Sequence, residues 1–178
     1  FYVLPPAEER GRIFSITDKR LPALTGDGRS TVEELVLADE RAVILADVYL
    51  DNLAARRDEV PAAGEAVPLT DLGTHCRGAL FLDGEQFRTP ELESAVDAIS
   101  RRVPGFYCGR YDIRAPDEAE LAAGRGLQVL ELNGVTSEAT HIYDPGNGLT
   151  EAWRVLFRQW RLAFELGAGV KNLFATDT

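Results

Sequence analysis

Two short segments of the chain, G-R-Y-D-I-R at 109–114 and L-E-L-N-G at 130–134, carry polar side chains at every second position. Successive side chains of a β-strand point to opposite faces, so alternate residues share a face. If the two strands pair with their polar faces together, two carboxylates, one amide and one guanidinium converge. The residues on these faces are Arg110, Asp112 and Arg114 in the first segment and Glu131 and Asn133 in the second.

This group of side chains predicts a magnesium site. Mg²⁺ prefers oxygen ligands, usually a few carboxylates together with the phosphates of a substrate. We therefore expect Asp112, Glu131 and Asn133 to hold Mg²⁺ against the phosphates of a nucleotide. Arg110 would lie beside the transferring phosphoryl group and offset charge as it develops. Without a cation the two carboxylates would disfavour each other's ionisation.

The segment after the second strand, G-V-T-S-E-A-T-H at 134–141, is typical of a binding loop. Gly134 would allow a ligand to approach the backbone closely. Thr136 and Ser137 would donate hydrogen bonds to a carboxylate or an acyl phosphate. His141 could reach the site from this loop, although a lone loop histidine is more often a surface residue.

A bland interpretation competes with the magnesium site, because alternating charges on a strand are often just its solvated face. Three features favour the site. Apolar residues flank both segments, which indicates central strands; Asn133 stands where the second strand ends, although Asn is depleted in strands; and turn residues follow at once.

A second candidate is T-H-C-R-G, where His75 and Arg77 would share a face of a strand and contact phosphate or substrate. A strand entry with solvated polar groups is an equally good interpretation. Lys19 is a further, weakly supported phosphate contact. Cys76 and Cys108 are expected to be buried small apolar groups and not nucleophiles.

Composition limits the partners and the compartment. The 178 residues carry a net charge of −10, which disfavours nonspecific binding to nucleic acid or to an anionic membrane. Two cysteines form no disulfide framework, so we expect a reducing cytoplasm. No apolar run has membrane-span length. The start at Phe1 and the absence of Met indicate a piece of a longer protein, and a homodimer is left open.

Interspersed strand and helix signals predict an α+β fold with a largely antiparallel sheet flanked by helices, in a single domain over 1–178. Strands are expected near 12–17, within 61–69 with Pro68 at an edge, and at 78–84, and the two polar strands should span 106–113 and 127–133.

Helix signals are of two kinds. Ser30 and Glu33 predict a capping box, and Thr89 with Pro90 predicts the start of another helix. Residues 41–57 should also be helical, and 115–126 should form a solvated loop. A last helix should run from Thr150 to a stop at Gly167 with an apolar face packed on the sheet, made of Trp153, Leu156, Phe157, Trp160 and Phe164.

At this point the chain resembles the ATP-grasp ligases. R-Y-D-I-R followed by V-L-E-L-N-G is similar to the Arg-x-Asp and Glu-x-Asn strands of that superfamily. L-P-A-L-T-G-D-G-R-S-T-V-E-E-L-V with P-A-A-G-E-A-V-P-L resembles the cyanophycin synthetase branch. E-L-N-G-V-T-S-E-A-T-H-I-Y-D-P resembles bacterial carboxylate–amine ligases related to D-alanine–D-alanine ligase. The D-alanine ligases follow their Asn with Thr-x-Pro-Gly, whereas Gly-Val-Thr-Ser follows here, so the resemblance does not define the amino-acid substrate.

The resemblance implies an ATP-grasp C-terminal subdomain that uses ATP and Mg²⁺ to join a small-molecule carboxylate to an amine through an acyl phosphate. It assigns Mg²⁺ to Asp112, Glu131 and Asn133 and places Arg110 at the phosphates. The N-terminal subdomain and most of the lid would precede Phe1, so the 178 residues alone should be inactive and bind ATP weakly. Two alternatives remain: a noncatalytic binding or assembly module, and a zinc hydrolase using His75 and His141.

Overall fold

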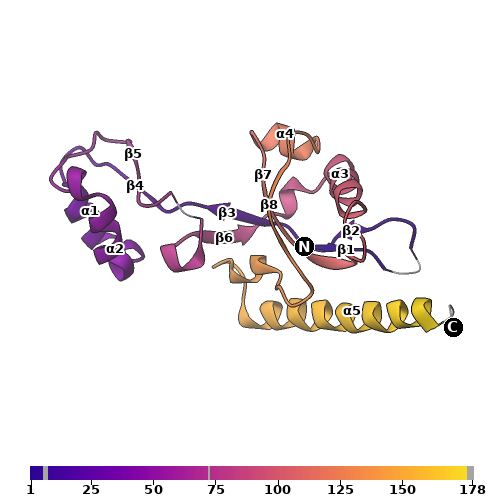
Figure 1. The fold of residues 1–178 in the computed structure, drawn as a ribbon. Helices are drawn as coiled ribbons and strands as arrows, with labels where there is room; N and C mark the ends of the chain where they lie inside the picture. The colour runs from indigo at the N-terminus through magenta and orange to yellow at the C-terminus, as the bar shows by residue number, and fades with distance from the viewer. Residues whose placement is uncertain (6–7, 72, 176–178) are drawn as a thin grey trace. The chain divides into compact units, whose positions relative to one another are not determined.

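The fold is a mixed α+β arrangement of small antiparallel sheets and helices, as the sequence predicts (Figure 1). The computed structural model describes residues 1–5, 8–71 and 73–175, with the backbone alone at His75 and 170–175. The strands are β1 (Tyr2–Val3), β2 (Arg12–Ile13), β3 (Thr17–Arg20), β4 (Ala23–Thr25), β5 (Ala66–Pro68), β6 (Leu80–Asp83), β7 (Cys108–Arg114) and β8 (Gln128–Asn133). The α-helices are α1 (Val32–Ala38), α2 (Ala46–Asn52), α3 (Pro90–Ser100), α4 (Glu118–Ala122) and α5 (Leu149–Ala175).

The chain divides into two compact units, one made of Phe1–Asp18 and Leu82–Thr178 and the other of Lys19–Phe81. It passes between them in β3 and β6, which pair with each other. Each unit has its own apolar core. That both units make one domain stays a prediction.

The first unit is built on a four-stranded sheet in the order β2-β1-β7-β8. Helix α3 contributes Leu92 and Val96 to a core that also contains Tyr2 and Ile13. Thr89 caps this helix by accepting a hydrogen bond from the Leu92 amide at 3.0 Å, as predicted, with Pro90 in the first turn.

Strand β8 differs from its prediction as a central strand. It lies at the edge of the sheet, and Leu130 and Leu132 are 62% and 41% exposed. An apolar flank alone does not distinguish a central strand from an edge strand, because burial depends on what packs against the strand. Strand β7, between β1 and β8, is central as predicted.

The second unit packs α1 and α2 beside the antiparallel pair β4–β5. Its core contains five side chains with almost no exposed surface: Val32, Val36, Tyr49, Val67 and Leu69. The predicted helix over 41–57 is divided into a 3₁₀ turn at Ala42–Leu45, α2, and a second 3₁₀ turn at Ala54–Arg56.

The predicted capping box of α1 is one residue out of register. Thr31 accepts the Glu34 amide at 3.2 Å, and the Glu34 carboxylate accepts the Thr31 amide at 2.8 Å. Ser30 instead donates its hydroxyl to Asp27. Within S-T-V-E-E, Ser30 with Glu33 and Thr31 with Glu34 both have the spacing of a capping box. Because the Ser30 hydroxyl is hydrogen-bonded to Asp27, Thr31 caps the helix.

Two predictions for the C-terminal half are wrong. The connector between β7 and β8 contains α4, which Asp117 caps at the Glu120 amide. Helix α5 continues past Gly167, because an isolated glycine costs a helix only about 1 kcal/mol.

The aromatic face of α5 does not pack on the sheet as predicted. Four of the five predicted residues are exposed, and Leu156 alone is partly buried. The exposed fractions are Trp153 59%, Phe157 70%, Trp160 46% and Phe164 75%. The opposite side supplies the buried contacts, including Gln159 and Leu166, at 3% and 4% exposed.

Among the residues that the structure describes, no helix combines the length and apolar character needed to cross a membrane.

Candidate functional site

Strands β7 and β8 are antiparallel, and their register places the polar residues opposite one another. Asp112 lies directly opposite Glu131, and Arg110 lies directly opposite Asn133. Directly opposed residues of an antiparallel pair point to the same face of the sheet. The pairing predicted from the alternating residues is therefore confirmed, and two carboxylates, one amide and one guanidinium share a face.

Arg110 is held at the centre of this face. Its Nε donates to Asp112 Oδ1 at 3.2 Å, and its Nη1 donates to the Glu138 carbonyl at 3.4 Å. The Arg110 and Asp112 side chains are 23% and 17% exposed. Arg110 thus links the strand to the loop after β8, in addition to offsetting the charge of Asp112.

Asn133 ends β8, and its amide nitrogen is buried although the residue as a whole is partly exposed. Its Nδ2 has no hydrogen-bond partner among the described residues. A buried polar atom without a partner costs about 1–3 kcal/mol, so such atoms commonly face a ligand or water. Gly109 lets the backbone at Asn133 approach β7, since a Cβ there would lie 2.2 Å from the Asn133 carbonyl oxygen.

These residues fit a divalent cation by their chemistry. Glu131 is exposed, Asp112 is mostly buried, and Nδ2 of Asn133 has no hydrogen-bond partner in the described part of the chain. A 180° rotation of that amide exchanges its oxygen and nitrogen, so either atom can face a ligand. Outside the masked positions, no three or more His, Cys, Asp or Glu side chains gather as a metal cluster, so an all-protein site of that kind is not present there.

The loop after β8 is anchored by a residue that the sequence analysis missed. Gln159 of α5 accepts the Ala139 amide at 2.9 Å and donates to the Ser137 carbonyl at 2.7 Å. Because both partners are backbone groups, a lone glutamine in a helix carries no sequence signal of this role. Gln159 holds the loop against the same unit that carries β7 and β8.

The residues predicted to contact substrate in this loop, Gly134, Thr136 and Ser137, have different surroundings. The Ser137 hydroxyl donates to the Gly134 carbonyl at 2.6 Å, so it would have to rotate to reach a ligand. Thr136 is exposed, and a Cβ at Gly134 would meet nothing within 4 Å. Open space at Gly134 is compatible with close ligand approach.

Arg114 lies beyond a register shift. The shift falls between Asp112 and Ile113, after which Arg114 opposes Gln128. Leu130 is the residue of β8 that is left without a partner by the shift. Arg114 is therefore separated from the Asp112–Glu131 pair by an irregular step of the ladder.

His75, Arg77 and Lys19 all belong to the second unit. The predicted strand at T-H-C-R-G is wrong: His75–Arg77 is a 3₁₀ turn, in which residues two apart do not share a face. Gly78, with φ of 80°, ends the turn, and a Cβ there would lie 2.0 Å from the Tyr49 hydroxyl.

The structure gives a backbone contact for Arg77 and a side-chain contact for Lys19, whereas the His75 side chain lies outside the described residues. The Arg77 carbonyl accepts a hydrogen bond from the Tyr49 hydroxyl at 3.0 Å. The Lys19 ammonium lies 5.4 Å from the centre of the Phe81 ring. A phosphate role for Lys19, His75 and Arg77 stays a prediction.

His141 and the cysteines complete the predicted set. Burial lowers the pKa of His141, and its Nδ1 is buried with no hydrogen-bond partner in the described chain. Cys108 is half-buried, which raises the pKa of its thiol, but Cys76 is exposed and not buried as expected.

No protein-family model matches the chain, and no curated protein sequence matches it.

Proposed function

We propose that this chain is the C-terminal catalytic part of an ATP-dependent carboxylate–amine ligase of the ATP-grasp type, acting in the cytoplasm. The observation that carries the proposal is the cross-strand pairing of Asp112 with Glu131 and of Arg110 with Asn133. Two carboxylates on one sheet face, with a side-chain amide at the strand end whose buried nitrogen has no partner among the described residues, suit a cation that also binds phosphate.

In this proposal each residue has a defined role. Asp112, Glu131 and Asn133 would hold Mg²⁺, which would neutralise the charge of the ATP phosphates. Arg110, already between Asp112 and the Glu138 carbonyl, would turn one N–H toward the transferring phosphoryl group. Arg114 would add positive charge farther along β7. Gly134, Thr136 and Ser137 would border the acyl end of the substrate.

The reaction would form an amide in two displacements. A carboxylate oxygen would attack the γ-phosphorus of ATP, giving an acyl phosphate and releasing ADP. The nitrogen of an amine would then attack the acyl carbon, lose a proton and expel inorganic phosphate. The loop held by Gln159 would exclude water from the acyl phosphate, which water would otherwise hydrolyse.

Manganese binding tests the metal site without any substrate. Mn²⁺ shares the oxygen preference of Mg²⁺, and its electron paramagnetic resonance signal reports the free ion. We expect Asp112→Asn and Glu131→Gln each to weaken Mn²⁺ binding by about tenfold, since each removes a charged ligand. Glu120→Gln, which removes a carboxylate of α4 that pairs with Arg125, should leave Mn²⁺ binding unchanged.

Equal Mn²⁺ affinity in the unsubstituted chain and both variants would contradict the site. ATP-dependent phosphate release by the whole protein separates catalysis from the noncatalytic alternative. If Asp112→Asn and Glu131→Gln both abolish release, the ligase proposal is supported. If release is unaltered in both, the catalytic role is excluded.

A further inference from the structure

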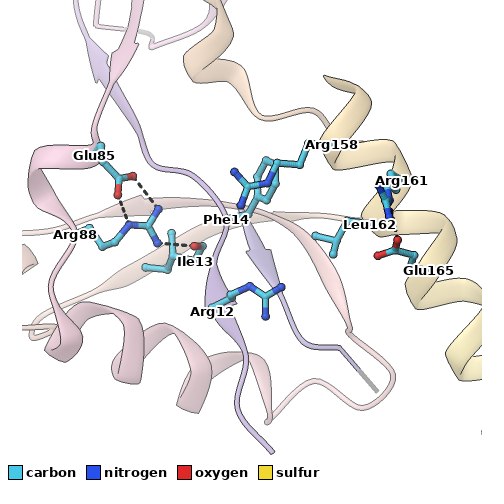
Figure 2. A pocket seen from close by; sticks show the side chains of 9 residues that line it. All are labelled: Arg12, Ile13, Phe14, Glu85, Arg88, Arg158, Arg161, Leu162 and Glu165. Atoms are coloured by element: carbon cyan, nitrogen blue, oxygen red, sulfur yellow. Dashed lines mark hydrogen bonds and ion pairs between the residues drawn. The ribbon is translucent and has the colours of Figure 1, made fainter. Parts of the chain in front are cut away.

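A pocket of about 560 Å³ lies in the unit formed by Phe1–Asp18 and Leu82–Thr178, apart from Asp112 and Glu131, which do not line it (Figure 2). This volume is in the range of small-molecule sites. Its walls come from β2 and the residue after it, from the segment between β6 and α3, and from α5. Three separate segments therefore contribute to one concave surface.

The lining is strongly cationic. Four guanidinium groups and two carboxylates border the pocket: Arg12, Arg88, Arg158, Arg161, Glu85 and Glu165. Three of these guanidinium groups have carboxylate partners: Arg12 pairs with Glu8, Arg88 with Glu85 and Glu93, and Arg161 with Glu165. Arg158 remains without a carboxylate at ion-pair distance among the described residues, and such a cation in an acidic protein attracts anions to one place.

The Arg88 side chain lines the pocket and is held in one orientation by three hydrogen bonds. Its Nη2 donates to Glu85 Oε2 at 2.8 Å, its Nε donates to the other oxygen of Glu85, and its Nη1 donates to the Ile13 carbonyl. Figure 2 shows this arrangement. The side chain is 27% exposed, so the guanidinium is held in place without being sealed off.

Arg158, on α5, is the cation whose charge the protein leaves available. Its guanidinium carbon lies 5.4 Å from the centre of the Phe14 ring. Within the described chain it has no carboxylate at ion-pair distance, whereas Arg161 is paired with Glu165 at 2.9 Å and Arg12 with Glu8 at 2.9 Å. Stacking on an aromatic ring orients the fork without neutralising it.

We propose that this pocket binds a phosphorylated small molecule. A phosphate monoester carries a charge near −2 at neutral pH and three acceptor oxygens, which suit the available charge of Arg158 and the N–H donors of the neighbouring arginines better than a single carboxylate does. Phe14, Ile13 and Leu162 provide apolar surface for the body of the molecule. The inference is independent of the ligase proposal, because it uses none of the same residues.

Titration with two matched probes tests this site. Phenyl phosphate and benzoate share a ring but differ in the anionic group, and both can be titrated calorimetrically into the 178-residue chain at pH 8 and low salt. We expect phenyl phosphate to bind about tenfold more tightly than benzoate. Arg158→Gln should weaken phenyl phosphate binding about tenfold, because a charged donor is lost.

Two controls keep the test decisive. Arg154→Gln changes an arginine one turn away on α5 that pairs with Glu151 and does not line the pocket, so it should leave binding unchanged. If Arg158→Gln disturbs folding in circular dichroism, Arg161→Gln replaces it, because that side chain is 82% exposed.

Three results would overturn the proposal: no phenyl phosphate binding at millimolar concentration, equal affinity for benzoate, or equal affinity of the unsubstituted chain and both pocket variants. Asp112→Asn provides the remaining comparison. It should leave phenyl phosphate binding unchanged while weakening Mn²⁺ binding, so failure of one proposal is distinguishable from failure of the other.

Discussion

At the scale of single residues, the candidate site is distinguished by a buried polar atom that has no hydrogen-bond partner in the described part of the chain. The buried Asn133 amide nitrogen and the His141 Nδ1 have no hydrogen-bond partner among the described residues, whereas Arg110 and Gln159 are engaged at both ends. Folding normally pairs such buried atoms because desolvation is costly. The unpaired nitrogen of Asn133, on the strand that carries Glu131, therefore distinguishes this sheet face from an ordinary solvated one.

His141 predicts a pH dependence of stability. Burial holds its pKa in the folded chain below the ordinary value of 6.5, although the charges of Asp83 and Glu85 act in the opposite direction. The unfolded chain then binds more protons than the folded chain below about pH 7, so the contribution to stability is present above the unfolded pKa and is lost as pH falls. The loss is at most about 1.4 kcal/mol per pH unit.

Chemical denaturation at pH 8 and pH 5.5 measures this loss. The unsubstituted chain should lose more unfolding free energy between the two pH values than His141→Gln, which does not titrate. Because the chain has only two histidines, a comparison of proton NMR spectra also assigns the His141 resonance. A His141 pKa measured above 6.5 would be incompatible with the expected sign.

At the scale of elements, side-chain anchors decide how helices sit on the sheet of the first unit. Asp97 of α3 accepts the Tyr2 hydroxyl at 2.7 Å and the Gly11 amide at 2.9 Å, which ties the helix to β1 and to the residue before β2. Gln159 does the same for α5 and the loop after β8. These polar contacts fix orientation, which apolar contacts alone leave loose.

The two sides of α5 should respond differently to substitution. Leu166→Ala removes a side chain that is 4% exposed and should lower the unfolding free energy by about 2–5 kcal/mol. Phe157→Ala removes one that is 70% exposed and should change it by less than about 1 kcal/mol. Urea denaturation compares the variants. A larger loss for Phe157→Ala would mean that the aromatic face is covered in solution.

At the scale of the whole molecule, the chain contains two units that each bury their own core. Val67 and Val96, with 0% and 5% exposed, belong to the cores of the second and the first unit. Separate cores permit separate local unfolding, which native-state hydrogen exchange detects.

Matched valine substitutions test this independence. Val67→Ala should remove about 2 kcal/mol of protection from amides of α1 and α2 and leave those of α3 and β7 unchanged. Val96→Ala should have the reverse effect. If either substitution lowers protection equally in both units, they unfold as one cooperative body.

Local signals predicted much of the first unit. Thr89 with Pro90 marked the start of α3, and the alternation around Asp112 and Glu131 predicted both strands and their shared face, because capping and strand alternation depend on neighbouring residues alone. The predicted helix end at Gly167 is wrong, because the weak preference of one glycine against a helix is outweighed by the other residues of the 27-residue helix α5.

By itself, the sequence determined the α+β character, the periodicity of the polar strands and the polar set at their meeting point, since these follow from residue order. Only the tertiary structure decided that β8 is an edge strand, that the aromatic face of α5 is exposed, and that four arginines from three segments line one pocket. Burial and charge convergence depend on which distant segments pack together, and residue spacing along a chain does not encode that directly.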